Sequence, residues 1–182
     1  MNNRFSSAAI GHLERFVADW ERGQPANDAT RQPWRDEKIA VIGSGPAGLV
    51  CAGQLADMGY PVTVYEALHA PGGVLRYGIP EFRLPNAVLD WEIDVLRQRG
   101  VEIANNIIVG KTIALDALLD DMGFAAVFVG TGAGLPKFLG IPGENLNGVF
   151  SANEFLTRIN LMRAYDFPVS DTPMKVGKRV AV

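Results

Sequence analysis

The stretch that decides the fold covers residues 38–67 and reads KIAVIGSGPAGLVCAGQLADMGYPVTVYEA. Apolar residues at 39–42 predict a short buried strand, and three closely spaced glycines follow it. The pattern over 46–58 predicts a helix with Gly59 just past its end, and residues 62–65 predict a second strand. A strand, a helix and a strand joined at this spacing form a right-handed parallel unit.

The three glycines form the pattern Gly-x-Gly-x-x-Gly, which is typical of dinucleotide-binding turns. Gly43 permits a tight turn out of the strand, Gly45 lets a pyrophosphate approach the backbone, and Gly48 lets the helix pack close to the strand. The helix N-terminus offers free N–H groups and the positive end of its dipole to phosphate. Pro46 suits the first helical turn, where its missing N–H costs nothing.

A carboxylate, Glu66, ends the second strand 18 residues after Gly48. It can accept hydrogen bonds from both ribose hydroxyls of an adenosine, and it argues against a 2′-phosphate and therefore against NADP in this pocket. It does not distinguish FAD from NAD. A plain glycine-rich turn is the structural alternative, but the strand before, the helix after and the acid together favour a dinucleotide.

Further strands and helices alternate along the rest of the chain. Helices are expected at 85–99, 115–122 and 152–164, and strands at 101–104, 106–109, 125–129 and 178–182. An amphipathic helix is expected at 8–22, followed by a polar linker at 23–37. The predicted class is therefore α/β, a Rossmann-like domain with a mainly parallel sheet, preceded by a short helical segment.

Composition excludes several other classes. The 182 residues are 48% hydrophobic with a formal net charge of −3, so neither a nucleic-acid surface nor a membrane partner is expected. No apolar run reaches the roughly 20 residues of a membrane helix, and no secretory signal is visible, so we expect a cytoplasmic protein. A single cysteine, Cys51, and two separated histidines argue against a metal site. Cys51 is interpreted as a small buried residue.

The loop over residues 66–85, EALHAPGGVLRYGIPEFRLP, is long and rich in glycine and proline. Loops of this length usually have a function. A nicotinamide dehydrogenase would continue with another strand and helix, whereas this loop could line the ribityl and flavin end of an extended FAD. Arg76 and Tyr77 could either flank the flavin or cap the loop.

Three motifs resemble the family of the small subunit of NADPH-dependent glutamate synthase: GSGPAGL, GGVLRYGIPEFRLP, and VFVGTGA with the later PKFLGIPGENLNGV and ANEFL. Relatives include the large subunit of NADH-dependent ferredoxin–NADP oxidoreductase and the N-terminal part of dihydropyrimidine dehydrogenase. The similarity covers nearly the whole chain, from about Ile10 onward.

This resemblance implies an oxidoreductase that binds FAD and passes electrons from NADPH through FAD to iron–sulfur centres. Gly130 to Ala133 would form a second glycine turn near the cofactor, Arg83 would contact it, and the Val109 backbone would touch adenine. The residues implied in cofactor binding are Gly43, Ser44, Gly45, Pro46, Ala47, Gly48, Glu66, Gly72, Gly73, Val74, Arg83, Val109, Thr131, Gly132 and Ala133. No catalytic side chain is implied, because the cofactor carries the chemistry.

The resemblance also implies a fragment. Residues 1–37 would end an iron–sulfur helical domain, 38–170 would form an incomplete FAD domain, and 171–182 would begin an NADPH domain whose glycines are absent. The 4Fe–4S and NADPH sites of full-length relatives are absent from this sequence, and a larger catalytic or electron-accepting subunit is the expected partner. Two alternatives stay open: a non-catalytic Rossmann-like interaction module, and a fragment of an NAD-binding dehydrogenase.

Overall fold

The computed structural model describes residues 9–24, 32–171 and 173–182. The chain divides into two units, Met1–Arg31 and Gln32–Val182. The described part of the first unit contains helix α1, Ile10–Arg22, which confirms the predicted amphipathic helix. Its apolar side chains, Ile10, Leu13, Phe16, Val17 and Trp20, are all more than half exposed. Residues 1–8 and 25–31, on which parts of the expected first domain fall, lie outside the described residues.

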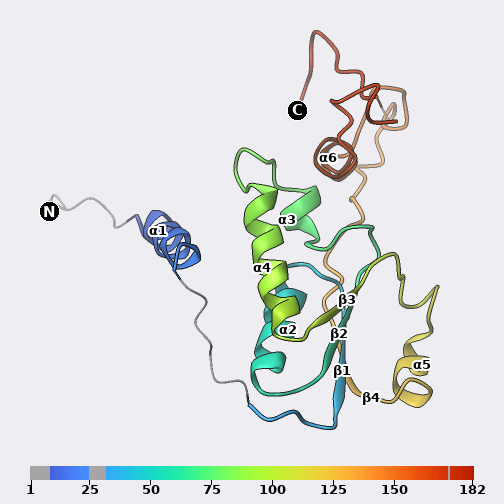
Figure 1. The fold of residues 1–182 in the computed structure, drawn as a ribbon. Helices are drawn as coiled ribbons and strands as arrows, with labels where there is room; N and C mark the ends of the chain where they lie inside the picture. Colours follow the sequence, from blue (N-terminus) through green and yellow to red (C-terminus); the bar gives the residue numbers. More distant parts are fainter. Residues whose placement is uncertain (1–8, 25–31, 172) are drawn as a thin grey trace, which may run out of the picture. The chain divides into compact units, whose positions relative to one another are not determined.

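The second unit is built on a four-stranded parallel sheet with the order β3-β2-β1-β4 (Figure 1). The strands are β1, Lys38–Ile42; β2, Val62–Tyr65; β3, Glu102–Ala104; and β4, Phe124–Val129. Val41 in β1 is in register with Val64 in β2 and Phe128 in β4. The α/β class with a parallel sheet is therefore confirmed.

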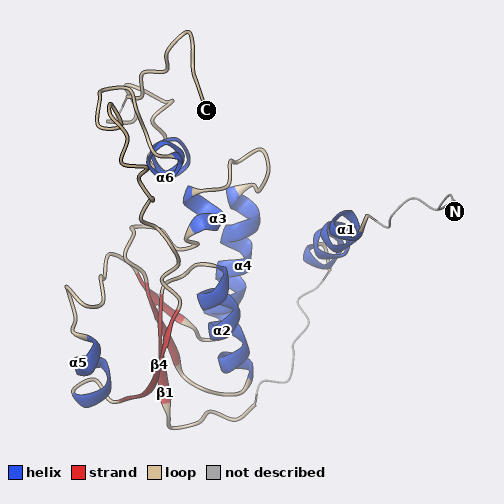
Figure 2. Cartoon of the chain, turned by 180° about the vertical axis from the view of Figure 1, so that it is seen from behind, coloured by secondary structure: helices blue, strands red, loops and turns tan. Residues whose placement is uncertain are grey.

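Helices cover the two faces of the sheet unequally (Figures 1 and 2). Helices α2, Pro46–Asp57, and α4, Asn86–Gln98, lie on one face, and α5, Leu115–Asp120, lies on the other. Because β1 is covered on both faces, its residues from Ile39 onward are all buried. Alternate residues of β1 point to separate clusters, one with Val41, Ala52 and Val64, and one with Ile42, Tyr65, Leu118 and Phe124.

Four sequence predictions need correction. Residues 106–109 form no strand. The backbone turns at Asn106, just after β3, where φ is 61°, and only an isolated bridge joins Val109 to Ile113. The expected loop at 66–85 contains a short helix, α3, Val74–Tyr77. The helix expected at 152–164 is shorter: α6 covers Ala152–Leu156, continues as a π-helical turn, η1, Thr157–Leu161, and ends before Arg163 at φ of 52°.

The fourth correction concerns the expected strand at 178–182, which forms no strand in the structure. A strand is stable only beside a partner, and none of the described residues pairs with this segment.

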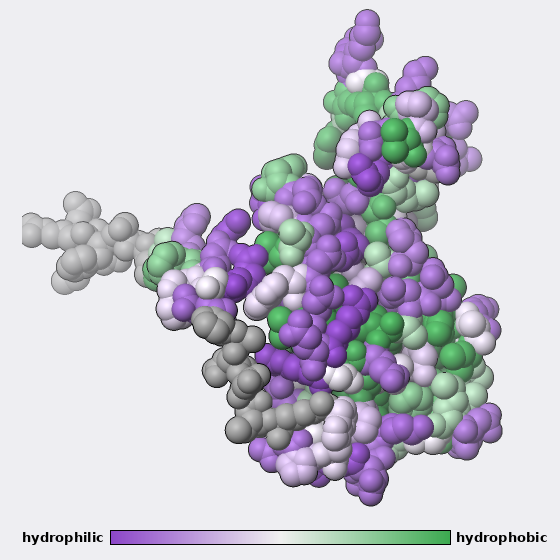
Figure 3. All heavy atoms as spheres, in the orientation of Figure 1, coloured by the Kyte–Doolittle hydropathy of each residue, from purple (hydrophilic) through white to green (hydrophobic). Residues whose placement is uncertain are grey.

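The edge strand β4 is only partly covered. Val129 is 60% exposed, and the outer side chains of α5, Leu115 and Leu119, are exposed as well. Figure 3 shows hydrophobic surface in this region of the sheet and α5. In the part of the chain that the structure describes, no helix has both the length and the apolar character needed to cross a membrane.

Candidate dinucleotide-binding site

Three glycine turns meet at the carboxyl edge of the parallel sheet, the edge at which open α/β sheets bind ligands. They follow β1, β2 and β4, and contain Gly43–Gly48, Gly72–Gly73 and Gly130–Gly132. The Gly43 N–H donates to the Tyr65 carbonyl at 2.8 Å, and the Gly130 N–H donates to the Ile42 carbonyl at 2.8 Å. These backbone bonds hold the first and third turns against the strand ends.

The three fingerprint glycines have different environments. A Cβ on Gly43 would lie 2.5 Å from the Gly130 carbonyl oxygen, and φ there is +96°. A Cβ on Gly48 would overlap the Gly43 carbonyl oxygen. A Cβ on Gly45 would meet no atom within 4 Å. Gly43 and Gly48 are therefore required by the protein's own packing, whereas Gly45 leaves free space beside the chain.

That free space lies at the N-terminus of α2. Gly45 is the N-cap residue of this 12-residue helix, Pro46 follows it, and the first turn contains no acidic residue. Ala47 is exposed and Gly48 is buried. An anion beside Gly45 would therefore face unpaired N–H groups and the positive end of the helix dipole without a competing carboxylate in that turn.

Glu66 follows β2 directly and is buried, with 5% of its surface exposed. Its Oε2 accepts hydrogen bonds from the Ser44 backbone N–H at 3.0 Å and from the Ser44 hydroxyl, and its Oε1 accepts from the Leu68 N–H at 2.8 Å. These donors compensate for the burial of the carboxylate. They join the end of β2 to the first glycine turn.

The second glycine turn is tied to the first. The Gly72 N–H donates to Ser44 Oγ at 2.9 Å, and the backbone then turns at Gly72 and Gly73 with φ of 124° and 52°. Arg76, in α3, donates from Nε to the Pro71 carbonyl at 2.7 Å and pairs with Asp90 of α4. Arg76 therefore caps this loop, which is one of the two roles that the sequence left open.

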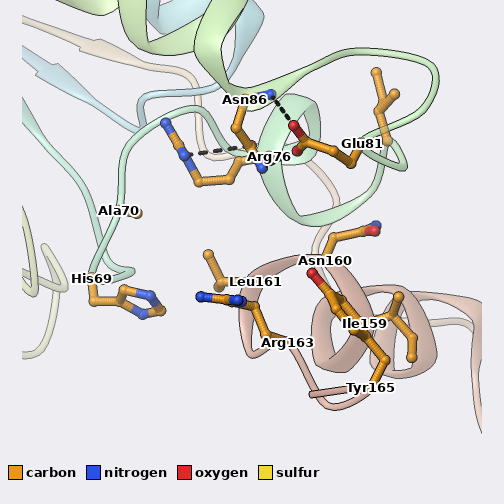
Figure 4. A pocket seen from close by; sticks show the side chains of 11 residues that line it. His69, Ala70, Arg76, Glu81, Asn86, Ile159, Asn160, Leu161, Arg163 and Tyr165 are labelled. Atoms are coloured by element: carbon orange, nitrogen blue, oxygen red, sulfur yellow. Dashed lines mark hydrogen bonds between the residues drawn. The ribbon is translucent and has the colours of Figure 1, made fainter. Parts of the chain in front are cut away.

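A pocket of about 490 Å³ lies between this loop and η1 (Figure 4). On one side it is lined by His69, Arg76 and Asn86, and on the other by residues of η1 and the turn after it. Asn160 donates from Nδ2 to the Tyr77 carbonyl at 3.0 Å and so joins η1 to α3.

Sequence reasoning missed the far wall of this pocket. Asn160, Arg163 and Tyr165 line it although they lie about 80 residues along the chain from the loop. No short-range pattern indicated them, because the π-helical turn that contains Asn160 looks like ordinary helix in the sequence, and Arg163 and Tyr165 lie in the turn after it.

The other predicted site residues lie apart or at the margin. Thr131 lies beside Gly43, since a Cβ on Gly43 would be 3.2 Å from the Thr131 Cα, while Gly132 and Ala133 are exposed. Val74, the first residue of α3, is 44% exposed.

Arg83 and Val109 are not among the residues that line the pocket of Figure 4. Arg83 is exposed before α4 and does not line the pocket. Val109 packs on the cluster that contains Tyr65 and Phe124. Their cofactor contacts stay predictions.

Two ionisable groups near the site are perturbed by burial. Desolvation raises the pKa of the Cys51 thiol above 9.0, in keeping with its packing against the cluster of Val41 and Val64. Desolvation, with the nearby Glu102 carboxylate, raises the pKa of Tyr65 above 10.0. Among the described residues, no group of three or more His, Cys, Asp and Glu side chains is arranged to hold a metal ion.

The parallel sheet, the three glycine turns and the acid after β2 define a dinucleotide-binding domain of the Rossmann-like class. Residues 41–101 match the family described as NAD(P)-binding Rossmann-like domain. Over 70% of its length, the chain superimposes on an oxidoreductase, FprA of Mycobacterium tuberculosis in complex with NADPH, with a TM-score of 0.58 and 26% identity, covering 29% of that chain.

Curated relatives are oxidoreductases. The chain is 33% identical to the small chain of glutamate synthase [NADPH] from Halomonas elongata, over 100% of this chain and 39% of that protein. It is 37% identical to the β subunit of NADP(+)-dependent formate dehydrogenase from Moorella thermoacetica, over 96% and 27%. It is 46% identical to subunit PreT of NAD-dependent dihydropyrimidine dehydrogenase from Escherichia coli, over 71% and 32%.

The chain therefore belongs to the group of oxidoreductases related to the glutamate synthase small chain, and the resemblance of its motifs is confirmed. It spans 27–39% of the length of these three relatives.

Proposed function

We propose that this chain is the FAD-binding portion of an oxidoreductase that takes electrons from NADPH and passes them to iron–sulfur centres. The observation that carries the proposal is the convergence of the three glycine turns, with free space at Gly45 and the buried Glu66 at the same edge. This arrangement provides backbone N–H groups for a pyrophosphate and a carboxylate for a ribose.

The residues present fit FAD. The free space at Gly45, where a side chain would find no neighbour, fits the close approach of a pyrophosphate. The pocket between the loop and η1, at about 490 Å³, is large enough for part of an extended cofactor, and it adjoins the second glycine turn through Arg76. A buried oxygen, Oδ1 of Asn105 at the end of β3, has no partner in the protein. These features support a large polar ligand at the carboxyl edge.

The protein's part in the reaction would be binding, orientation and control of polarity. The backbone of the first glycine turn and the N-terminus of α2 would bind the pyrophosphate, and Glu66 would orient the adenosine ribose. Gly72, Gly73 and Val74 would line the continuation of the site. When bound, FAD would supply the chemistry that converts a hydride into single electrons.

The wider assignments also stand as proposals. Residues 1–37 would belong to an iron–sulfur helical domain, 38–170 to the FAD domain and 171–182 to the start of an NADPH domain. A larger catalytic or electron-accepting subunit would take the electrons. The names of the relatives, which mention NADPH-linked glutamate synthase and NADP(+)-dependent formate dehydrogenase, support a nicotinamide donor.

A second candidate is an NAD-binding domain, which the NAD(P)-binding description of the family matching residues 41–101 favours. Glu66 suits the adenosine ribose of NAD as well as that of FAD. The two candidates differ in their ligand, so one titration distinguishes them.

The test is a visible absorbance spectrum of the purified chain, followed by titration with FAD and, separately, with NAD. Retained flavin bands, or saturable quenching of FAD fluorescence, would support the proposal. Binding of NAD in preference to FAD would favour the second candidate. Absence of binding to either ligand would overturn both and leave a non-catalytic module.

A further inference from the structure

We propose that Ser44 is a positioning residue that fixes Glu66 and the Gly72 turn before the cofactor arrives. This inference rests on the proposed function, because the ligand concerned is the adenosine end of FAD. Within the fingerprint Gly-x-Gly-x-x-Gly, Ser44 is the first variable residue, and the pattern itself assigns it no role.

Ser44 is fully buried, with no exposed surface, at the point where the ends of β1 and β2 meet. Its side chain contacts two segments distant in sequence. The hydroxyl donates to Glu66 Oε2, and Ser44 Oγ accepts from the Gly72 N–H at 2.9 Å. A buried hydroxyl with both a donor and an acceptor partner is fixed in orientation.

The direction of these bonds follows from the partners. A backbone N–H can only donate, so Gly72 occupies an acceptor lone pair of Ser44 Oγ. An ionised carboxylate can only accept, so the Ser44 hydroxyl donates its hydrogen to Glu66 Oε2. Both interactions therefore depend on one oxygen, and neither survives removal of the hydroxyl.

Glu66 would keep part of its support without this hydroxyl. The Ser44 backbone N–H and the Leu68 N–H would still donate to the carboxylate, at 3.0 and 2.8 Å. The Gly72 N–H, which is buried, would lose its acceptor. Ser44→Ala is therefore expected to leave the fold in place, to loosen the carboxylate and to release the second glycine turn.

The consequence for recognition is specific. A carboxylate held in one position discriminates between a ribose and a 2′-deoxyribose, because the missing hydroxyl removes one hydrogen bond to Glu66 that no other group replaces. A loosened carboxylate discriminates less. A general weakening of the site would instead reduce the affinities for both ligands by the same factor.

The experiment compares wild type, Ser44→Ala, Ser44→Cys and the control Ser151→Ala. The Ser151 hydroxyl accepts from the Glu154 N–H at the start of α6, so this control also removes one serine side-chain bond. Affinities for FAD and for its analogue with 2′-deoxyadenosine are measured by flavin fluorescence. Amide exchange of Gly72 and Leu68 is measured by NMR without ligand, and Ser44→Ala is repeated in a Glu66→Ala background.

We expect Ser44→Ala to weaken FAD binding by about tenfold and to bring the ratio of the two affinities closer to one. The Gly72 amide should exchange faster, and Ser44→Ala should reduce the affinity less after Glu66→Ala, because only the bond from Gly72 to Ser44 is then left to lose. Ser44→Cys, which keeps a weak donor, should behave between wild type and alanine, and Ser151→Ala should leave the ratio unchanged.

An unchanged ratio in Ser44→Ala, with unchanged exchange at Gly72, would overturn the role of Ser44 while leaving the flavin proposal intact. If wild type bound no FAD, the proposed function would fail. The exchange data would then still test the bond between the Gly72 N–H and Ser44 Oγ. Faster exchange at Gly72 in Ser44→Ala would support this bond, and unchanged exchange would refute it. If Ser44→Ala did not fold, Ser44→Cys would decide by the same ratio.

Discussion

Gly73 lies directly against Gly45: a Cβ on Gly73 would be 2.8 Å from the Gly45 Cα. The second glycine turn therefore backs one side of Gly45, while the direction of the missing Gly45 side chain is free of atoms within 4 Å. The close contact and the free space both lie at Gly45, so the first and second glycine turns, which are distant in the sequence, form one surface.

Gly45→Val should abolish FAD binding with little loss of stability. The φ and ψ of Gly45 are −69° and −178°, which any residue adopts, and the side chain would enter the free space proposed for the pyrophosphate. We expect the free energy of unfolding to fall by no more than about 1 kcal/mol. Gly11→Val, also free of neighbours but in the first unit, is the control that should keep the cofactor. If Gly45→Val retained FAD, the pyrophosphate would not bind beside Gly45, and the proposed position of the site would be wrong.

Gly48→Ala should act on stability instead. The added methyl group would overlap the Gly43 carbonyl oxygen, so α2 would have to move away from β1. Overpacking of this kind costs about 1–3 kcal/mol. Urea unfolding measures this loss of stability. An unchanged midpoint would show that the turn relaxes more easily than its geometry indicates.

Glu66→Gln should lower both stability and FAD affinity. The amide group keeps one acceptor oxygen but turns a donor toward N–H groups of Ser44 or Leu68, which need acceptors. A buried donor left without its acceptor costs about 1–3 kcal/mol. Glu102→Gln, on the exposed edge of β3, is the matched control at neutral pH. Equal effects of the two variants in thermal unfolding and FAD titration would contradict this role for Glu66.

Stability should fall at alkaline pH. Burial raises the pKa of Cys51 above 9.0 and, together with Glu102, raises that of Tyr65 above 10.0. Both groups ionise more easily in the unfolded chain, so their contribution is fully present below about pH 9 and is lost as pH rises through their folded pKa values. The thermal midpoint should therefore drop as the pH rises from about 9 to about 11. Cys51→Ala combined with Tyr65→Phe should drop less over that interval, and an equal drop would assign the effect to other groups.

The sequence predicted most of the central fold because its signals there are local. The apolar strands, the glycine fingerprint and the acid after β2 all lie within residues 38–67, and the structure forms them there. The roles of Gly48, which packing requires, and Gly45, which leaves space, were also predictable, because they follow from the turn itself. The close approach of Gly130 to Gly43 was not, because Gly130 lies in a turn far along the chain. The predicted strand at 106–109 was wrong, because apolar content alone does not supply a pairing partner.

What the sequence by itself determined is the class of fold and the position of the first glycine turn, since strand and helix periodicity and glycine spacing act over short distances. Only the tertiary structure decided which turns meet. The bond of Gly72 to Ser44 and that of Asn160 to Tyr77 join residues 28 and 83 positions apart. The physical reason is that a hydrogen bond between distant residues depends on the twist of the sheet and the packing of helices, and these are set by the whole core at once.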